Sequence, residues 1–173
     1  PCPTFTAARV RGTVSEPDLA EVSGLAAGRA NPGVLWAHAD SGADAELHAL
    51  SASGRWLAAY ELRGATAEDW EDLAIGPGLE PGRSYLYVGD IGDNAASRAD
   101  VTIYRTPEPV LDDPPGPGPL ALTDVEALRA EYPDGPHDAE ALLVDPRSGD
   151  IFIVTKTLAT GPSGVYRYPA AQQ

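Results

Sequence analysis

Three stretches of the sequence repeat one pattern around a leucine: EVSGLAAG at residues 21–28, DWEDLAIG at residues 69–76 and DAEALLVD at residues 138–145. Each reads acid, any residue, Ser or Glu, any residue, Leu. Each continues through a turn rich in Gly, Pro or Asp into a strand-like run, namely VLWAHAD, YLYVGD or IFIVTK. Because self-similarity along a chain is the signature of repeat folds, the pattern predicts antiparallel hairpins in series.

A third strand is predicted after each hairpin, in ELHALSA (46–52), VTIYRTP (101–107) and GVYRYPA (164–170). RWLAAYELRG (55–64) and ALTDVEALRAEYPDG (121–135) supply a fourth strand in the first two units. The unit is therefore a four-stranded meander, and the predicted fold is an all-β propeller built from such antiparallel blades. One alternative stays open, because Val125, Leu128 and Tyr132 also fit one face of a short helix, although the place in the repeat favours a strand.

The repeat divides residues 1–173, as a partial propeller domain, into about three blades, which is half of a six-bladed ring. Blade 1 covers 18–64, blade 2 covers 69–135 with the Pro-rich insertion 106–120, and blade 3 is incomplete over 138–173. Residues 5–12 are a candidate outer strand that closes the last blade. Propellers generally need four to eight blades, so we expect a partner that supplies the remaining half, either a second fragment or a second copy.

The meander also predicts where the acids lie. Loops between strands two and three share one face with the connections between blades, because successive strands reverse direction. One rim of the ring is therefore predicted to collect Asp40, Asp44, Asp69, Glu71, Asp72, Asp90, Asp93, Asp138 and Glu140.

Carboxylates packed at one channel mouth repel one another unless a cation neutralises them. Calcium accepts six to eight hard oxygen ligands in flexible geometry, and the sequence has no helix-borne His pair or Cys cluster for zinc. The predicted calcium ligands are Asp40, Glu71, Asp90, Asp93, Asn94 and Glu140. In the alternative, Asp, Asn and Gly are ordinary turn formers whose side chains satisfy their own backbone.

Composition excludes two classes of partner. Lys and Arg number 12 against 26 Asp and Glu, and the net charge of -14 disfavours nucleic acid. The sequence contains no run of 18 or more apolar residues, so no membrane-spanning helix is predicted. The chain begins at Pro1 without an initiator Met, which favours a secreted, extracellular or cell-surface protein, and Cys2 is its single cysteine.

The motifs WAHADSG, DWEDLA, YVGDIGDN and DAEALLVDP together resemble bacterial secreted six-bladed β-propeller proteins, and more distantly the β-propeller phytases and related calcium-dependent propellers. The resemblance covers most of the chain. It implies about three further blades and calcium held at the channel mouth by residues such as Glu71, Asp90, Asp93 and Glu140.

Two functions stay open at this level. In the first, a calcium-assisted hydrolase acts on phosphate or other esters of an anionic small molecule, and Lys156 and Arg98 stabilise the developing negative charge. In the second, a non-catalytic extracellular module binds a protein or glycan on the acidic face, and the two cations only neutralise neighbouring acids.

Overall fold

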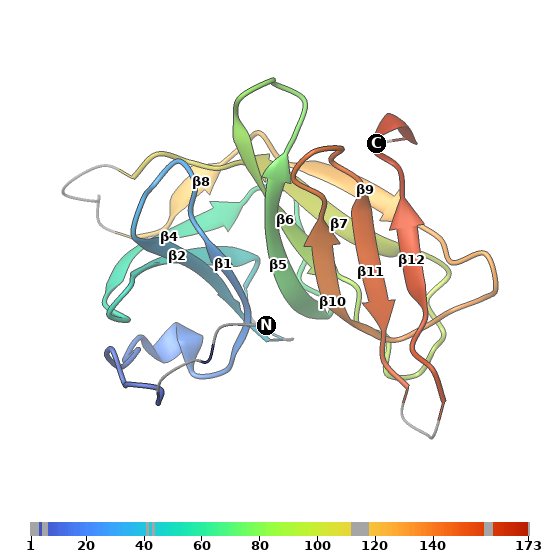
Figure 1. The fold of residues 1–173 in the computed structure, drawn as a ribbon, viewed down its shortest axis with the longest axis horizontal. Coiled ribbons are helices and arrows are strands. Elements are labelled where there is room, and N and C mark those ends of the chain that lie inside the picture. The colour runs from blue at the N-terminus through green and yellow to red at the C-terminus, as the bar shows by residue number, and fades with distance from the viewer. Residues whose placement is uncertain are drawn as a thin grey trace.

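The computed structural model describes residue 4 and residues 7–40, 42, 44–111, 118–157 and 161–172. These residues form an all-β fold of three open sheets that lie side by side (Figure 1). The first sheet contains β1 (Val22–Ala27), β2 (Val34–Ala39), β3 (Glu46–Ser51), β4 (Trp56–Leu62) and β8 (Leu120–Leu122), in that order. The second contains β5 (Trp70–Pro77), β6 (Ser84–Asp90), β7 (Val101–Pro107) and β9 (Glu126–Ala130). The third contains β10 (Ala139–Val144), β11 (Ile151–Thr155) and β12 (Val165–Tyr168).

The hairpins predicted around the three leucines are confirmed. β1 pairs with β2, β5 with β6 and β10 with β11, all antiparallel, and β3, β7 and β12 follow as third strands. Each first strand also has a register shift at the same point of the repeat: between Val22 and Leu25, between Trp70 and Asp72, and between Ala139 and Ala141. A bulge bends a strand and redirects its side chains. The repeated motif therefore encodes a repeated bulge as well as a hairpin.

The fourth strand of the second unit differs from the prediction. Residues 121–135 contribute to two strands in different sheets, because β8 pairs in parallel with β4 of the first sheet whereas β9 completes the second sheet. The segment forms no helix, so the strand interpretation of Leu128 is confirmed. A strand over residues 5–12 is not seen in residues 7–12, and residues 5 and 6 lie outside the described part of the chain. The ring-closing role of that segment stays a prediction.

The first strands of the three sheets lie next to one another, with β5 between β1 and β10 (Figure 1). Two side chains join them to each other. The Ser23 hydroxyl of β1 donates to the Glu71 carbonyl of β5 at 2.9 Å, and the Leu142 N–H of β10 donates to the Asp72 carboxylate at 2.7 Å. Gly24 allows the close approach of β1 to β5, because a Cβ there would lie 2.7 Å from the Leu73 nitrogen.

Two apolar cores separate the three sheets. Trp36, Leu47 and Tyr60 of the first sheet pack with Trp70 and other residues of the second. The opposite side of the second sheet packs against the third sheet. This second core contains Tyr87, Ile103, Leu142, Ile151 and Ile153. Fully burying a large apolar side chain contributes roughly 1.5–3 kcal/mol, so these two cores are the main source of stability. The second sheet is buried on both of its faces.

The outer faces of the first and third sheets differ. Leu19, in the short 3-10 helix η1 (Pro17–Leu19), is buried against Ala37 and Leu50 of the first sheet, with Val14 and Trp56 packed beside it. On the third sheet, Leu143 and Val165 are 59% and 66% exposed. A second short 3-10 helix, η2 (Ala170–Gln172), follows β12. Among the described residues, the third sheet therefore has one apolar face without a cover.

A buried carboxylate fastens the first sheet to the second at the end away from the predicted acidic rim. Glu108 follows β7 and is almost fully buried. Its oxygens accept hydrogen bonds of 2.6–3.1 Å from the backbone N–H groups of Arg29 and Ala30, and from the side chains of Asn31, Trp36 and Ser84. Burial by itself raises the pKa of Glu108, but these donors outweigh it and hold the pKa below its ordinary value.

We predict that Glu108→Gln lowers the free energy of unfolding by about 1–3 kcal/mol, because the new amide group faces donors that then lack an acceptor. Since the folded-state pKa lies below the unfolded value, the stabilisation is complete at neutral pH and is lost as the pH falls below 4.5. Urea unfolding at pH 7 and pH 4 measures both effects. Glu80→Gln, an exposed carboxylate on the neighbouring turn, is the matched control and should change stability by less than about 0.5 kcal/mol.

Candidate metal centre

The beginnings of the three first strands are tied to the loops that follow the second strands. Asp40 N–H donates to the Glu21 carbonyl at 2.9 Å, Gly92 N–H to the Asp69 carbonyl at 3.1 Å, and Lys156 N–H to the Asp138 carbonyl at 2.8 Å. The same backbone bond thus recurs in every repeat. It places an acidic residue, at position 21, 69 or 138, at the same end of each sheet.

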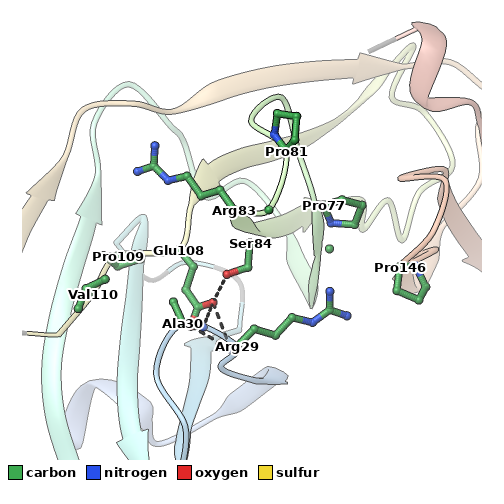
Figure 2. Close-up of a pocket in the computed structure, with 12 residues that line it drawn as sticks. Arg29, Ala30, Pro77, Pro81, Arg83, Ser84, Glu108, Pro109, Val110 and Pro146 are labelled. Carbon is green, nitrogen blue, oxygen red and sulfur yellow. Dashed lines mark hydrogen bonds between the residues drawn. The ribbon is translucent and has the colours of Figure 1, made fainter.

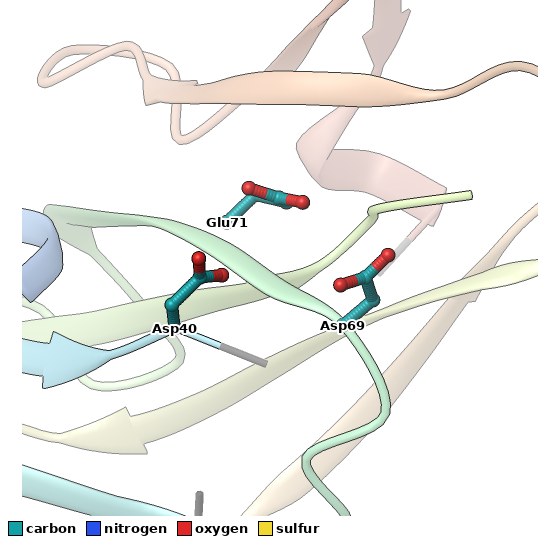
Figure 3. A group of neighbouring side chains, drawn as sticks. All are labelled: Asp40, Asp69 and Glu71. Carbon is teal, nitrogen blue, oxygen red and sulfur yellow. The ribbon is translucent and has the colours of Figure 1, made fainter. Parts of the chain in front are cut away.

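Five carboxylates gather where these ends meet. In one group, oxygens of Asp40, Asp69 and Glu71 lie within 4.8 Å of one another (Figure 3). In a second group, oxygens of Glu71, Asp138 and Glu140 meet the same limit. Glu71 belongs to both groups, so the two groups are adjacent. We call these five residues the acidic cluster.

The acidic cluster is electrostatically unfavourable without a cation. Partial burial, followed by repulsion from Glu140, Asp69, Asp40 and Asp138, raises the pKa of Glu71 from its ordinary value of 4.5 to about 7. Burial and the charges of Asp138 and Asp40 also raise the pKa of Asp69, although Arg98 opposes that shift. A group of carboxylates that resist ionisation together is the arrangement that a divalent cation relieves.

Gly92 brings the loop after β6 onto this cluster. A Cβ at this position would lie 2.4 Å from the Asp69 carboxyl carbon and 2.6 Å from a Glu71 oxygen. Glycine therefore leaves the space that the two carboxylates occupy. The loop itself is held by Asp93, whose N–H donates to Asp138 Oδ1 at 2.8 Å.

The structure brings three of the six predicted metal ligands into the acidic cluster, namely Asp40, Glu71 and Glu140. The other three lie outside it. Asp90 is buried and accepts hydrogen bonds from the Glu68 and Asp69 N–H groups and from Arg98. Asp93 Oδ2 accepts the N–H groups of Ser97 and Arg98, and Asn94 is exposed in the loop. In the stretch GDIGDN, the turn-forming alternative describes the contacts of these aspartates.

The two cations expected to stabilise an anion are both engaged with acids. Arg98 Nη1 donates to Asp90 at 2.8 Å and to the Gly92 carbonyl at 2.9 Å, and the Arg98 side chain is 14% exposed. The Lys156 ammonium pairs with Glu140 and lies 3.4 Å from Asp138 Oδ2. Both cations already form ion pairs with acids, so their positive charges are largely compensated and would attract an anionic substrate only weakly.

Two members of the cluster, Asp69 and Asp138, were expected on the rim but not among the ligands. The signal for them is present in the repeat, because both occupy its first acidic position. Asp138 is buried, and its Oδ2 accepts no hydrogen bond in the described part of the chain. Such an atom is a better candidate ligand than the loop residues Asp93 and Asn94, whose spacing alone suggested a metal.

A cavity of about 760 Å³ lies at the other end of the sheets, between the turns β1-β2, β5-β6 and β10-β11 (Figure 2). Arg29, Pro77 and Pro146 line it, and Glu108 lies at its wall. The hydrogen bonds described above already satisfy the Glu108 carboxylate and favour its ionised form. It is therefore suited to joining the two sheets and poorly suited to act as a general base.

No protein-family model, curated protein or solved structure matches this chain. The resemblance to secreted calcium-dependent propellers therefore stays a prediction. No helix among the described residues is long and apolar enough to cross a membrane.

The raised pKa of Glu71 makes stability depend on pH in the absence of metal. Because the folded-state pKa exceeds the unfolded value, the folded form loses stability as the pH rises from 4.5 to about 7, and the loss is constant above that range. We predict that Glu71→Gln removes this slope and stabilises the chelator-treated protein at pH 8 by about 1–2 kcal/mol, after solvent screening is considered. Urea unfolding between pH 4 and pH 8 measures the difference, and equal slopes in both proteins would contradict it.

Proposed function

We propose that this chain is a calcium-binding, non-catalytic part of a secreted β-propeller, in which the acidic cluster holds the cation at the rim where the sheets meet. The observation that carries the proposal is the convergence of Asp40, Asp69 and Glu71 from two sheets, with ligand oxygens within 4.8 Å of one another. Calcium–oxygen distances are about 2.3–2.6 Å, so two oxygens on opposite sides of one ion lie roughly that far apart.

The donor set fits a hard cation. All five residues of the acidic cluster offer carboxylate oxygens, which calcium prefers, and neither histidine nor cysteine lies among them. The buried Asp138 Oδ2 accepts no hydrogen bond from a described residue, and its nearest cation is the Lys156 ammonium at 3.4 Å. A cation at Glu71 would also reverse the repulsion that raises the pKa of this residue.

The group formed by Asp40, Asp69 and Glu71 is the better position for the ion. Lys156 already pairs with Glu140 and approaches Asp138 in the second group. Neither Asp69 nor Glu71 forms an ion pair with a described cation. The ion would therefore join β5 of the second sheet to the end of β2 in the first, and calcium binding would stabilise the contact between those sheets.

A binding role is favoured over hydrolysis because the two candidate catalytic cations are occupied. Arg98 pairs with Asp90, and Lys156 pairs with Glu140. On this proposal the acidic face binds a protein or glycan through calcium and its surrounding loops. Calcium-dependent turnover of a phosphate ester that is lost in Lys156→Gln would instead support the hydrolase.

The propeller part of the proposal rests on the serial arrangement of the sheets and on the uncovered face of β10–β12. Each of the two interfaces between sheets buries one apolar face of each neighbour. Leu143 and Val165 present a third such face. We propose that a further sheet of the same repeat packs there, supplied by the remaining half of the ring.

We predict that calcium raises the melting temperature at pH 7.5 relative to the chelator-treated protein, because a ligand that binds only the folded state stabilises it by mass action. At calcium concentrations 100 times Kd the gain is about 2.7 kcal/mol. Glu71→Gln should abolish most of the gain, since it removes the ligand common to both groups. Calorimetry with and without chelator measures it.

Glu61→Gln is the matched control, because it removes one negative charge from a part-exposed residue of β4 that is paired with Arg63. Its calcium response should equal that of the unaltered protein. A melting temperature that does not respond to calcium or chelator would reject the metal centre. An equal loss in both variants would indicate a general charge effect.

We predict that the chain self-associates through the uncovered face when no other half is present, because exposed contiguous apolar surface favours burial. Light scattering after size-exclusion chromatography should show concentration-dependent assembly, and Leu143→Asp should shift it toward monomer. Leu79→Asp, which changes an exposed leucine on the β5–β6 turn, is the control. A chain that stays monomeric at all concentrations would contradict this prediction.

A further inference from the structure

Three chemically different side chains meet on the loop between β9 and β10. The Tyr166 hydroxyl lies 2.9 Å and 2.8 Å from the two carboxylate oxygens of Asp134, and 2.9 Å from His137 Nε2. His137 Nε2 lies 3.1 Å from Asp134 Oδ1. A phenol oxygen, an imidazole nitrogen and a carboxylate oxygen thus converge on one point.

The scaffold fixes these groups from two directions. Tyr166 lies on β12, where it pairs with Ile153 of β11. Asp134 and His137 come from the β9–β10 loop, three residues apart. The buried Tyr132 ring packs edge-on against both aromatic partners, with centroids 4.7 Å from Tyr166 and 5.2 Å from His137. The three ligand atoms are therefore held together by packing as well as by hydrogen bonds.

The site remains accessible to solutes. The side chain of His137 is 33% exposed and that of Asp134 is 59% exposed. In the protein without a metal, hydrogen bonds join the three groups: the Tyr166 hydroxyl donates to the Asp134 carboxylate and lies within hydrogen-bond distance of His137 Nε2.

We propose that Asp134, His137 and Tyr166 form a second metal site, selective for a divalent transition-metal ion such as Cu²⁺ or Zn²⁺. Around an ion with bonds of about 2.0–2.1 Å, ligand atoms lie roughly 2.9 Å apart at the right angles of a copper site and roughly 3.4 Å apart in a tetrahedral zinc site, and these three atoms lie 2.8–3.1 Å apart. Imidazole suits copper and zinc, whereas calcium takes oxygen ligands. The imidazole therefore gives this site a preference for copper and zinc over calcium, and the site shares no residue with the acidic cluster.

The binding step balances as follows. The ion bonds to an Asp134 carboxylate oxygen, to His137 Nε2 and to the Tyr166 phenolate oxygen. The phenol O–H bond breaks and its proton goes to solvent. If His137 carries its proton on Nε2, that proton moves to Nδ1 and the imidazole stays neutral. One proton is released for each ion bound, and no oxidant or reductant takes part.

The test uses tag-free protein with Cys2→Ser as the parent, because a thiol would bind the same ions. Zn²⁺ is titrated by calorimetry in two buffers that differ in ionisation enthalpy, and Cu²⁺ binding is followed by visible absorption. With Ca²⁺ present in excess to occupy the acidic cluster, we expect one Zn²⁺ or Cu²⁺ ion to bind per chain, with release of one proton and, for copper, a tyrosinate-to-copper charge-transfer band. His137→Ala should weaken Zn²⁺ binding by more than roughly 10–100-fold, the loss typical of removing an outer partner of a metal ligand.

Tyr166→Phe keeps the packing of the ring and should remove both the charge-transfer band and the proton release. Glu61→Gln, on β4 and outside both proposed metal sites, is the matched control and should leave Zn²⁺ and Cu²⁺ binding unchanged. The proposal is overturned if neither ion binds, if His137→Ala changes affinity by less than twofold, or if Glu61→Gln abolishes Zn²⁺ binding. Circular dichroism of each variant verifies that it is folded.

Discussion

The burial of the second sheet on both faces is the constraint on which the remaining structure depends. Tyr87 and Ile103 pack toward the third sheet, whereas Trp70 and Leu86 pack toward the first. A sheet with two apolar faces can be stable only between two neighbours. This arrangement places the first strands β1, β5 and β10 side by side and brings the acidic position that opens each repeat to one end.

The acidic cluster is a consequence of that packing, and its repulsion is opposed by features that bind the sheets together. The pKa of Glu71 is raised to about 7 because the side chain is partly buried and because four other carboxylates repel its charge. Asp72, the next residue, points instead to the Leu142 N–H and joins β5 to β10. Adjacent acids on one bulge thus have opposite roles, since one stabilises the contact between sheets and the other is destabilised by it. A bound cation would convert the second role into the first.

At the other end of the sheets, polar burial is resolved within the protein itself. The Glu108 carboxylate has enough donors to remain ionised without a cationic partner, whereas Glu71 has repelling neighbours. The two residues therefore differ in pKa direction although both are partly or fully buried glutamates between the same two sheets. The direction of each shift follows from what faces the carboxylate, and we propose the ion at the end where the carboxylates repel one another.

Local alternation and the repeat of short motifs were enough to predict the all-β class, the hairpins around Leu25, Leu73 and Leu142, and the gathering of acids at one end. Which of these acids meet depends on how the sheets pack. Asp90 and Asp93 look like ligands in the sequence, yet their oxygens are used by nearby backbone N–H groups and by Arg98. The division of residues 121–135 between two sheets, and the meeting of Asp134 with Tyr166, likewise depend on contacts between distant segments, which no local pattern specifies.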